Sequence, residues 1–257
     1  CRERGIWLIE DNCDALGSTL NGKPTGSFGD MSTLSFYPAH HITTGEGGMV
    51  AFNSPKLRRP LESFRDWGRA CYCPPGEDDT CNKRFGWKLG GLPDGYDHKY
   101  TYSHIGYNLK STDIQASLGS SQLESLDGFI TARRENFAFY SEALAHRDEL
   151  LLPRATPGSN PSWFGFPILL RSEFHRSRED LVRFLTARNI GTRLLFGGNL
   201  ARQPAYQDVE FRFASDLRGA DEAMHRGFWI GTFPGLTLEM TAFVVESIED
   251  FLDGRTK

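Results

Sequence analysis

Long apolar runs are missing from this sequence of 257 residues, and no stretch is apolar enough over sufficient length to cross a bilayer. No signal peptide is visible at the beginning of the chain. The net charge is only -4, which argues against a nucleic-acid partner. Cysteine is limited to five residues, too few to suggest a secreted disulfide scaffold in a chain of this size. These absences predict a cytoplasmic globular protein that binds neither a membrane nor a nucleic acid.

The sequence also has no initiating methionine, since it begins at Cys1 and enters a strand-like run almost at once. We therefore expect a fragment whose N-terminal part is absent. The hydrophobic fraction of 39% and the charged fraction of 24% are ordinary for a globular protein. The length suffices for one large domain or two small ones.

Short apolar runs between glycine, proline and polar residues predict alternating strands and helices. The first, at 5–10, reads as a buried parallel strand that ends in acid. The other expected strands lie at 31–37, 49–52, 163–170 and 190–196. The expected helices lie at 55–66, 114–126, 129–150 and 178–188. Residues 68–102 have no clear period, and a loop of that length in a compact domain is usually functional or disordered.

Asp11 follows the first expected strand, at the edge where open α/β sheets bind ligands. One interpretation is a helix cap or a loop acid. The other is the partner of a pyridinium nitrogen, which the carboxylate keeps protonated and electron-withdrawing. Ser35 also has two interpretations, because a lone serine is either a solvated loop residue or a phosphate-binding hydroxyl.

Four cysteines form the pattern C-x57-C-x-C-x7-C, and three of them fall in the irregular segment 68–102. The spacing is neither that of a zinc ribbon nor that of a plant-type ferredoxin. From the residues alone, a Cys₄ site for zinc, a Cys₄ site for an iron–sulfur cluster and incidental buried thiols all stay open. The four residues are Cys13, Cys71, Cys73 and Cys81, and Cys1 lies outside the pattern.

Three segments resemble the DegT/DnrJ/EryC1/StrS sugar aminotransferase family of fold-type I pyridoxal phosphate enzymes. They read IEDNCDALG at 9–17, LSFYPAHHITTGEGG at 34–48 and HIGYNLKSTDIQASLGSSQLESLD at 104–127. The resemblance implies an α/β fold of the aspartate aminotransferase type, with a mostly parallel sheet in a large domain and a small C-terminal α/β domain. The predicted division is 1–128 for the large domain with the cysteine loop, 129–152 for a connecting helix and 153–257 for the small domain.

The resemblance also implies roles for single residues. Asp11 falls on the acid that binds the pyridine nitrogen, Ser35 on a phosphate ligand, and Asn108 on a residue that reaches the phosphate of the neighbouring subunit in a homodimer. His40 falls on the reactive lysine. Imidazole forms no stable covalent link to the cofactor, so polar contacts must hold pyridoxamine phosphate while His40 moves protons. His41 is the alternative base.

Histidine at the lysine position together with the four-cysteine pattern resembles the CDP-4-keto-6-deoxy-D-glucose 3-dehydrase family, which makes 3,6-dideoxyhexoses of the O-antigen type. This implies a 2Fe-2S cluster on the four cysteines, CDP-4-keto-6-deoxy-D-glucose as substrate and an NADH-dependent flavin and iron–sulfur reductase as partner. Asp14 and Tyr37 are candidates for adjusting the cofactor's O3′ environment. Two alternatives stay open: a cluster-free enzyme like GDP-4-keto-6-deoxymannose 3-dehydrase, and a non-enzymatic relative with structural zinc.

Overall fold

A computed structural model describes residues 1–74 and 76–255. The chain forms two compact units. The first unit comprises residues 1–12, 26–38 and 43–121, and the second comprises 13–25, 39–42 and 122–257. The predicted domains, by contrast, follow one another along the chain with boundaries at residues 128 and 152, and this division stays a prediction.

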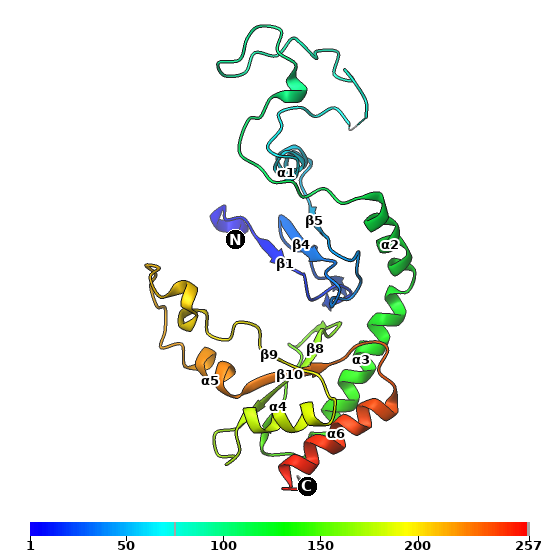
Figure 1. Cartoon of the computed structure of the whole chain (residues 1–257), viewed down its shortest axis with the longest axis vertical. Coiled ribbons are helices and arrows are strands. Elements are labelled where there is room, and N and C mark those ends of the chain that lie inside the picture. Colours follow the sequence, from blue (N-terminus) through cyan, green and yellow to red (C-terminus); the bar gives the residue numbers. More distant parts are fainter. Residues whose placement is uncertain (75, 256–257) are drawn as a thin grey trace. The chain divides into compact units, whose positions relative to one another are not determined.

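The first unit is built on a three-stranded sheet of order β1-β4-β5, with β1 at Ile9–Asp11, β4 at Met31–Ser35 and β5 at Gly48–Phe52 (Figure 1). β1 runs parallel to β4, with Asp11 opposite Thr33, whereas β5 runs antiparallel to β4. The predicted parallel direction of the first strand is confirmed. The segment 49–52 is also a strand, as predicted.

The predicted burial of the first strand is wrong. Only Ile9 and Glu10 of the run lie in β1, and Ile6, Trp7 and Ile9 are 56%, 61% and 58% exposed. β1 is an edge strand, and among the described residues no strand pairs with its outer side. In the described part of the chain, this apolar run therefore stays exposed.

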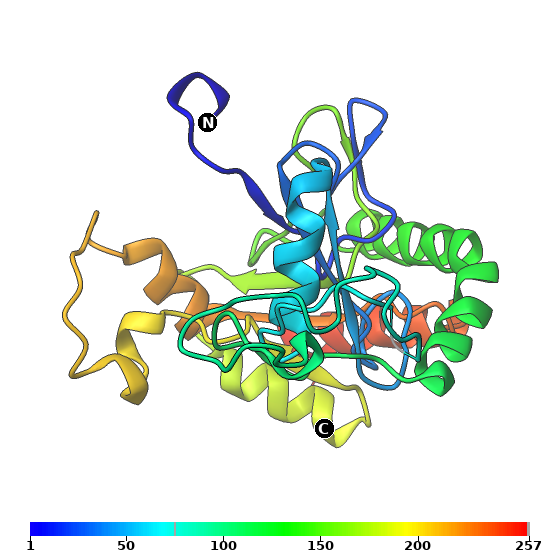
Figure 2. The same ribbon diagram turned by 90° about the horizontal axis from the view of Figure 1, so that it is seen from above.

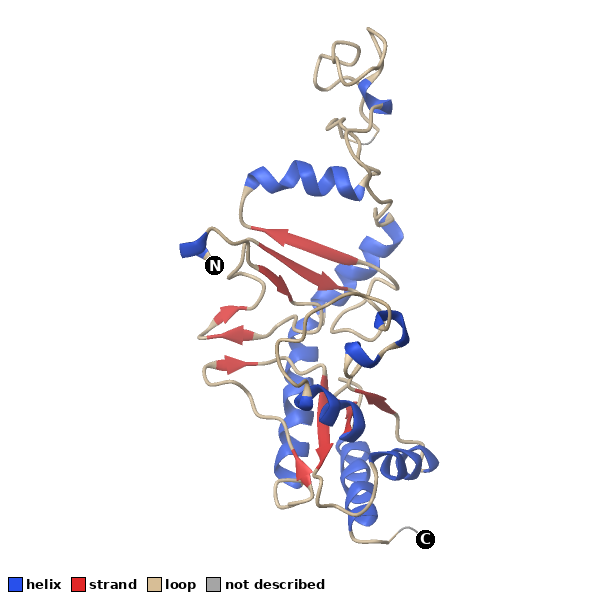
Figure 3. Ribbon diagram, turned by 90° about the vertical axis from the view of Figure 1, so that its left-hand side faces the viewer, coloured by secondary structure: helices blue, strands red, loops and turns tan. Residues whose placement is uncertain are grey.

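Two helices complete the regular part of the first unit. Helix α1 (Arg58–Arg65) follows a short 3-10 turn at Pro55–Leu57, and α2 spans Asp113–Glu124, of which residues 113–121 belong to this unit. The side chains of Thr112 and Gln115 begin α2 reciprocally: the Thr112 N–H donates to Gln115 Oε1 at 2.8 Å, and the Gln115 N–H donates to Thr112 Oγ1 at 3.3 Å. Between the two helices the chain is largely irregular, apart from a short 3-10 helix at His98–Tyr100 (Figure 3).

The second unit contains a four-stranded antiparallel sheet of order β6-β8-β10-β9. Its strands are β6 (Leu150–Leu151), β8 (Gly165–Leu170), β9 (Thr192–Leu194) and β10 (Gly227–Gly231). Its helices are α3 (Leu126–Ala143), α4 (Arg178–Ala187), α5 (Arg218–Arg226) and α6 (Leu238–Leu252). A small sheet joins β2 (Thr19–Leu20) to β3 (Lys23–Pro24) and to β7 (Ser159–Asn160).

The core of the second unit follows from the alternating pattern of β8. Phe166, Ile168 and Leu170 point inward and are at most 2% exposed. They pack in one cluster with Tyr140 of α3 and Ile248 of α6. Helices α4 and α6 lie side by side (Figure 2). In the part of the chain that is described, no helix is long and apolar enough to cross a membrane.

Candidate active site and metal site

His40 and Asp14 form an ion-pair contact in the second unit. The Nε2 atom of His40 lies 3.0 Å from Oδ1 of Asp14, and the two side chains are 16% and 37% exposed. A carboxylate at this distance fixes the orientation of the imidazole and stabilises it when it takes up a proton. The predicted proton-transfer residue therefore has a partner 26 positions away in the sequence.

Arg133 of α3 fixes the backbone at this site. Its side chain is only 3% exposed, and its guanidinium donates to the carbonyls of Trp163 and Phe164 at 3.2 Å and of His40 at 3.5 Å. Burial lowers the pKa of Arg133 to about 10, so the group stays charged at neutral pH. The ring of Phe164 meets the imidazole of His40 edge-on, with centroids 5.4 Å apart.

His41 has a different environment from that of its neighbour His40. It is 3% exposed, and its Nε2 lies 2.7 Å from the carbonyl oxygen of Ser162. Burial, together with the charge of Arg133, lowers the pKa of His41 to about 4. A neutral, buried, hydrogen-bonded imidazole is a structural group, and this geometry favours His40 over His41 as the base.

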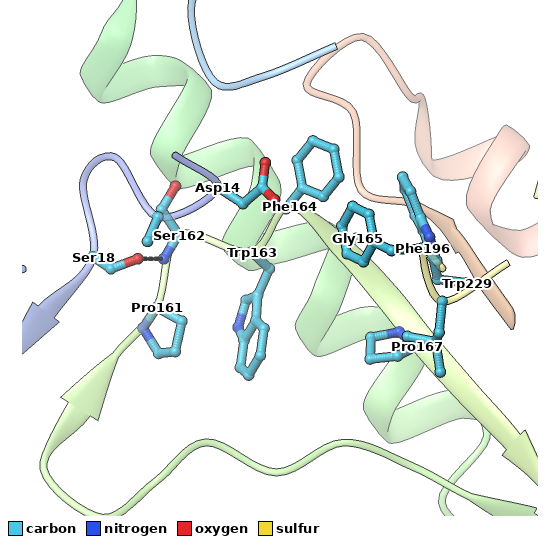
Figure 4. A pocket seen from close by; sticks show the side chains of 12 residues that line it. Asp14, Ser18, Pro161, Ser162, Trp163, Phe164, Gly165, Pro167, Phe196 and Trp229 are labelled. Carbon is cyan, nitrogen blue, oxygen red and sulfur yellow. Dashed lines mark hydrogen bonds between the residues drawn. The ribbon is translucent and has the colours of Figure 1, made fainter. Parts of the chain in front are cut away.

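An aromatic pocket adjoins Asp14 in the second unit (Figure 4). Phe164, Phe196 and Trp229 supply its apolar wall, with the Phe164 and Trp229 centroids 5.0 Å apart. At the polar end, the hydroxyl of Ser18 accepts a hydrogen bond from the Ser162 N–H at 2.8 Å. Phe164 and Trp229 were missed, because isolated aromatic residues are more often core than site.

Asp11 and Ser35 lie at the end of the first unit's sheet where strands β1 and β4 finish. Because β1 and β4 are parallel and Asp11 is opposite Thr33, both residues belong to the carboxyl ends of their strands. Thr33 Oγ1 donates to Asp11 Oδ1 at 3.2 Å, and the hydroxyl of Ser35 accepts from the Tyr37 N–H at 3.3 Å. Asp11 is exposed, as is the ring of Tyr37 at 49%. A carboxylate and a hydroxyl at this edge fit a pyridine nitrogen and a phosphate.

The irregular segment between α1 and α2 brings three cysteines together. Hydrogen bonds link Cys73 to both Cys71 and Cys81. The Thr80 side chain, which hydrogen-bonds Cys73, holds the pKa of that thiol below its ordinary value, whereas burial raises the pKa of Cys71 and of Cys81. Converging thiols of this kind fit a soft metal or a cluster. Cys13 belongs to the second unit, so its place in the set stays a prediction.

His98 is the residue of this group that the sequence reasoning missed. Its ring nitrogen and the sulfur atoms of Cys71 and Cys73 all lie within 4.8 Å of one another, and Nε2 lies 3.1 Å from the Cys81 sulfur. The available signal was its position, since it shares the irregular segment 68–102 with all three cysteines.

The irregular segment 68–102, which we call the cysteine loop, is closed at its base by backbone hydrogen bonds. The N–H of Trp67 donates to the carbonyl of Tyr107 at 2.7 Å, and the N–H of Ala70 donates to that of Thr101 at 2.9 Å. Asn108 forms an isolated bridge with Asp66 at the end of this pairing and is exposed. The segment is therefore an anchored loop, as functional loops often are.

Known proteins that are similar to this chain show its fold and its family. Solved structures of the pyridoxal phosphate-dependent aminotransferase fold superpose on the chain; E. coli GDP-4-keto-6-deoxy-D-mannose-3-dehydratase, solved with hydrated PLP, gives a TM-score of 0.82 at 26% identity, over 95% of this chain and 61% of that one. Residues 1–249 match the DegT/DnrJ/EryC1/StrS aminotransferase family, and the chain belongs to that family. The predicted family and fold class are confirmed.

Two curated relatives are much more similar in sequence. A Saccharopolyspora spinosa protein named dTDP-4-dehydro-2,6-dideoxy-D-glucose 3-dehydratase is 55% identical over 98% of this chain and 54% of its own length. The Salmonella typhimurium lipopolysaccharide biosynthesis protein RfbH is 56% identical over 96% of this chain and 56% of its own length. The chain thus spans about half the length of these relatives.

Proposed function

We propose that this chain forms part of an enzyme that removes the C3 hydroxyl of a nucleotide-linked 4-keto-6-deoxyhexose. The proposal rests on His40, which by its resemblance to the family motif falls on the position of the family's lysine and whose Nε2 lies 3.0 Å from Asp14 Oδ1. An imidazole so placed moves a proton but cannot bind the cofactor covalently. Two relatives named as 3-dehydratases, the Saccharopolyspora spinosa protein and the E. coli protein of known structure, support the same reaction class.

The net reaction balances only with a reductant. The C3–O bond breaks and water leaves, while two electrons and two protons enter and a C–H bond forms at C3. We assign the electrons to NADH, delivered one at a time by a flavin and iron–sulfur reductase. The product is the corresponding 4-keto-3,6-dideoxy sugar.

In this proposal, the residues at the end of the sheet bind the cofactor, and those of the second unit transfer the proton. When bound, pyridoxamine phosphate supplies an amine for the C4 ketone and an electron-withdrawing ring. The carboxylate of Asp11 keeps the ring nitrogen protonated, and the hydroxyl of Ser35 hydrogen-bonds the phosphate. His40 removes a proton, with Asp14 orienting its imidazole, and Tyr37 remains a candidate for contacts near the cofactor's O3′.

The four-cysteine set is assigned to a 2Fe-2S cluster that passes single electrons. The convergence of Cys71, Cys73 and Cys81 supports this assignment. Cys13 follows Asp11 by two residues, a span of roughly 7 Å in extended chain, so a cluster on Cys13 lies near a cofactor on Asp11. That proximity suits electron transfer into the bound sugar.

For the substrate we propose CDP-4-keto-6-deoxy-D-glucose, and the competing choice is a dTDP-linked sugar of the kind named for one relative. The complete enzyme, assayed with its reductase, should have the higher kcat/KM for the CDP sugar. A preference for the dTDP sugar contradicts the nucleotide assignment and leaves the reaction class intact.

Metal analysis of two serine variants tests the cluster and separates this enzyme from a cluster-free dehydratase. Cys71→Ser should lose iron, acid-labile sulfide and reductase-coupled turnover while keeping pyridoxamine phosphate. The matched control is Cys1→Ser, which changes an exposed cysteine outside the pattern and should keep all three. Full iron and turnover in Cys71→Ser show that the ligand assignment is wrong, and zinc in place of iron favours the structural-zinc alternative.

A further inference from the structure

The imidazole of His98 is buried among the cysteines, yet the proposed function leaves it without a role. The residue is 1% exposed, and its Nε2 lies 3.1 Å from the sulfur of Cys81. Among the described residues, its other ring nitrogen, Nδ1, is buried and has no hydrogen-bond partner. A polar ring is costly to bury in this way unless the sulfur contact compensates for it.

The surrounding side chains hold the ring in one plane. Trp87 stacks on His98 with centroids 4.3 Å apart and planes 15° apart. Tyr72 lies next to Trp87 at 5.5 Å, and the guanidinium of Arg59 lies 3.6 Å above the Tyr72 ring. A column of four adjoining groups thus runs from α1 to the cysteine loop. It covers the face of the imidazole and leaves the edge to meet the sulfurs.

The backbone around His98 is anchored as well. Its N–H donates to the Arg84 carbonyl at 3.1 Å, and Asp97 caps the short helix by accepting from the Lys99 N–H at 3.0 Å. Arg84 in turn donates from Nε to Asp97 at 2.8 Å. The ring nitrogen is therefore held at its distance from the sulfur by main-chain as well as side-chain contacts.

The tautomer follows from these contacts. A thiolate sulfur only accepts hydrogen bonds, so a contact with it requires the proton on Nε2. A proton on Nδ1 leaves a buried donor without an acceptor, which is rarer than an unsatisfied acceptor. With Cys81 as the thiolate of a metal ligand, the network therefore assigns Nε2–H as donor and the Cys81 sulfur as acceptor.

We propose that His98 donates a hydrogen bond from Nε2 to the Cys81 thiolate of the assembled cluster and thereby raises the cluster's reduction potential. This inference rests on the proposed function. Reduction adds negative charge to the cluster and its sulfur ligands, and a donor aimed at a sulfur stabilises the reduced state more than the oxidised one. His98 is a positioning and tuning residue, since four thiolates already complete the coordination of the two irons.

Redox titration of two His98 variants in the complete enzyme tests this role. His98→Phe keeps a ring to stack on Trp87 but has no donor, so the midpoint potential should shift to more negative values at unchanged iron and sulfide content. His98→Gln keeps an N–H donor and should return the potential toward that of the wild type. The control is His104→Phe, because His104 also packs against a ring, that of Phe64 with centroids 4.2 Å apart, but hydrogen-bonds Ser63 and Ser103.

Three results overturn the inference in distinguishable ways. Unchanged potential in His98→Phe with full iron overturns the hydrogen bond alone. Loss of iron from both His98 variants, with strong nitrogen coupling in the electron paramagnetic resonance spectrum of the reduced wild type, shows that His98 is a ligand. A wild-type enzyme without iron overturns the proposed function and this inference with it.

Discussion

His40 is a single side chain on which the proposed chemistry depends. His40→Asn keeps a polar group but no base, so we expect a loss of roughly 100- to 10,000-fold in proton release from the cofactor and in C3 deoxygenation. Asp14→Asn should lose less, because it weakens the orientation of the imidazole and leaves the base in place. The measurement is the exchange rate of the cofactor's C4′ proton, and a near wild-type rate in His40→Asn places the base elsewhere.

Replacing His40 by lysine should add a covalent link to the cofactor instead of only removing the base. His40→Lys supplies an amine, and burial in the site lowers its pKa so that the free amine is accessible. We expect a covalent bond to pyridoxal phosphate that borohydride makes permanent, seen as a mass increase of the protein. C3 deoxygenation should be lost, because no cofactor amine is left for the sugar ketone. An unmodified mass after borohydride treatment argues that residue 40 does not face the cofactor.

His41 is expected to make stability depend on pH. Its pKa is lowered from 6.5 to about 4 in the folded state, so unfolding takes up a proton below pH 6.5. The stabilisation is present above pH 6.5 and is lost as the pH falls toward 4; between pH 7 and pH 5 it amounts to about 2 kcal/mol. Urea unfolding at both pH values should show this loss in the wild type but not in His41→Gln. His225→Gln, at an exposed histidine, should behave like the wild type.

At the scale of elements, the cysteine loop depends on the close approach of its two arms. A Cβ added at Gly106 meets the carbonyl oxygen of Phe64 at 2.9 Å and approaches the backbone of Trp67 and Gly68 more closely still. We expect Gly106→Ala to open the base of the loop at a cost of about 1–3 kcal/mol, giving faster proteolysis within the loop and faster loss of iron. Gly91→Ala is the control, because a Cβ there meets nothing within 4 Å; equal behaviour of the two variants contradicts the anchored loop.

Helix ends were predicted well from the sequence where a local capping motif marks them, and poorly where tertiary packing sets them. The helix predicted at 178–188 is α4 at Arg178–Ala187, where Ser177 and Asp180 form a complete capping box. The helix predicted at 129–150 ends instead at Ala143. Leu144 is fully buried and Leu150 pairs in β6, so packing decided that ending. Tertiary contacts of this kind are invisible to periodicity.

The candidate site could be predicted only where residue type and chain position coincide. Asp11, at the end of a strand, and the three loop cysteines were accessible in that way. The contact between His40 and Asp14 and that between His98 and Cys81 join residues that are distant in the sequence and need the fold.

At the scale of the whole molecule, we propose that the surface around Asn108 lies at a subunit boundary. Its neighbours Ile105, Tyr107 and Leu109 are 94%, 65% and 68% exposed, a run of large apolar side chains that a monomer rarely displays together. An isologous dimer covers such a surface with the same surface of a second copy. We therefore expect the complete enzyme to sediment as a dimer, and Asn108→Ala to retain its cofactor less well than the wild type.

Mixed dimers test whether Asn108 serves the site of the other subunit. One chain carries Asn108→Ala and the other carries His40→Asn, each with a different affinity tag, and each homodimer is impaired. If Asn108 reaches across the boundary, one site of the mixed dimer combines an intact His40 from the first chain with an intact Asn108 from the second. That site should regain about half of the wild-type activity per dimer, because the other site carries both changes. If Asn108 acts within its own chain, each site of the mixed dimer keeps one defect and activity stays at the level of the homodimers.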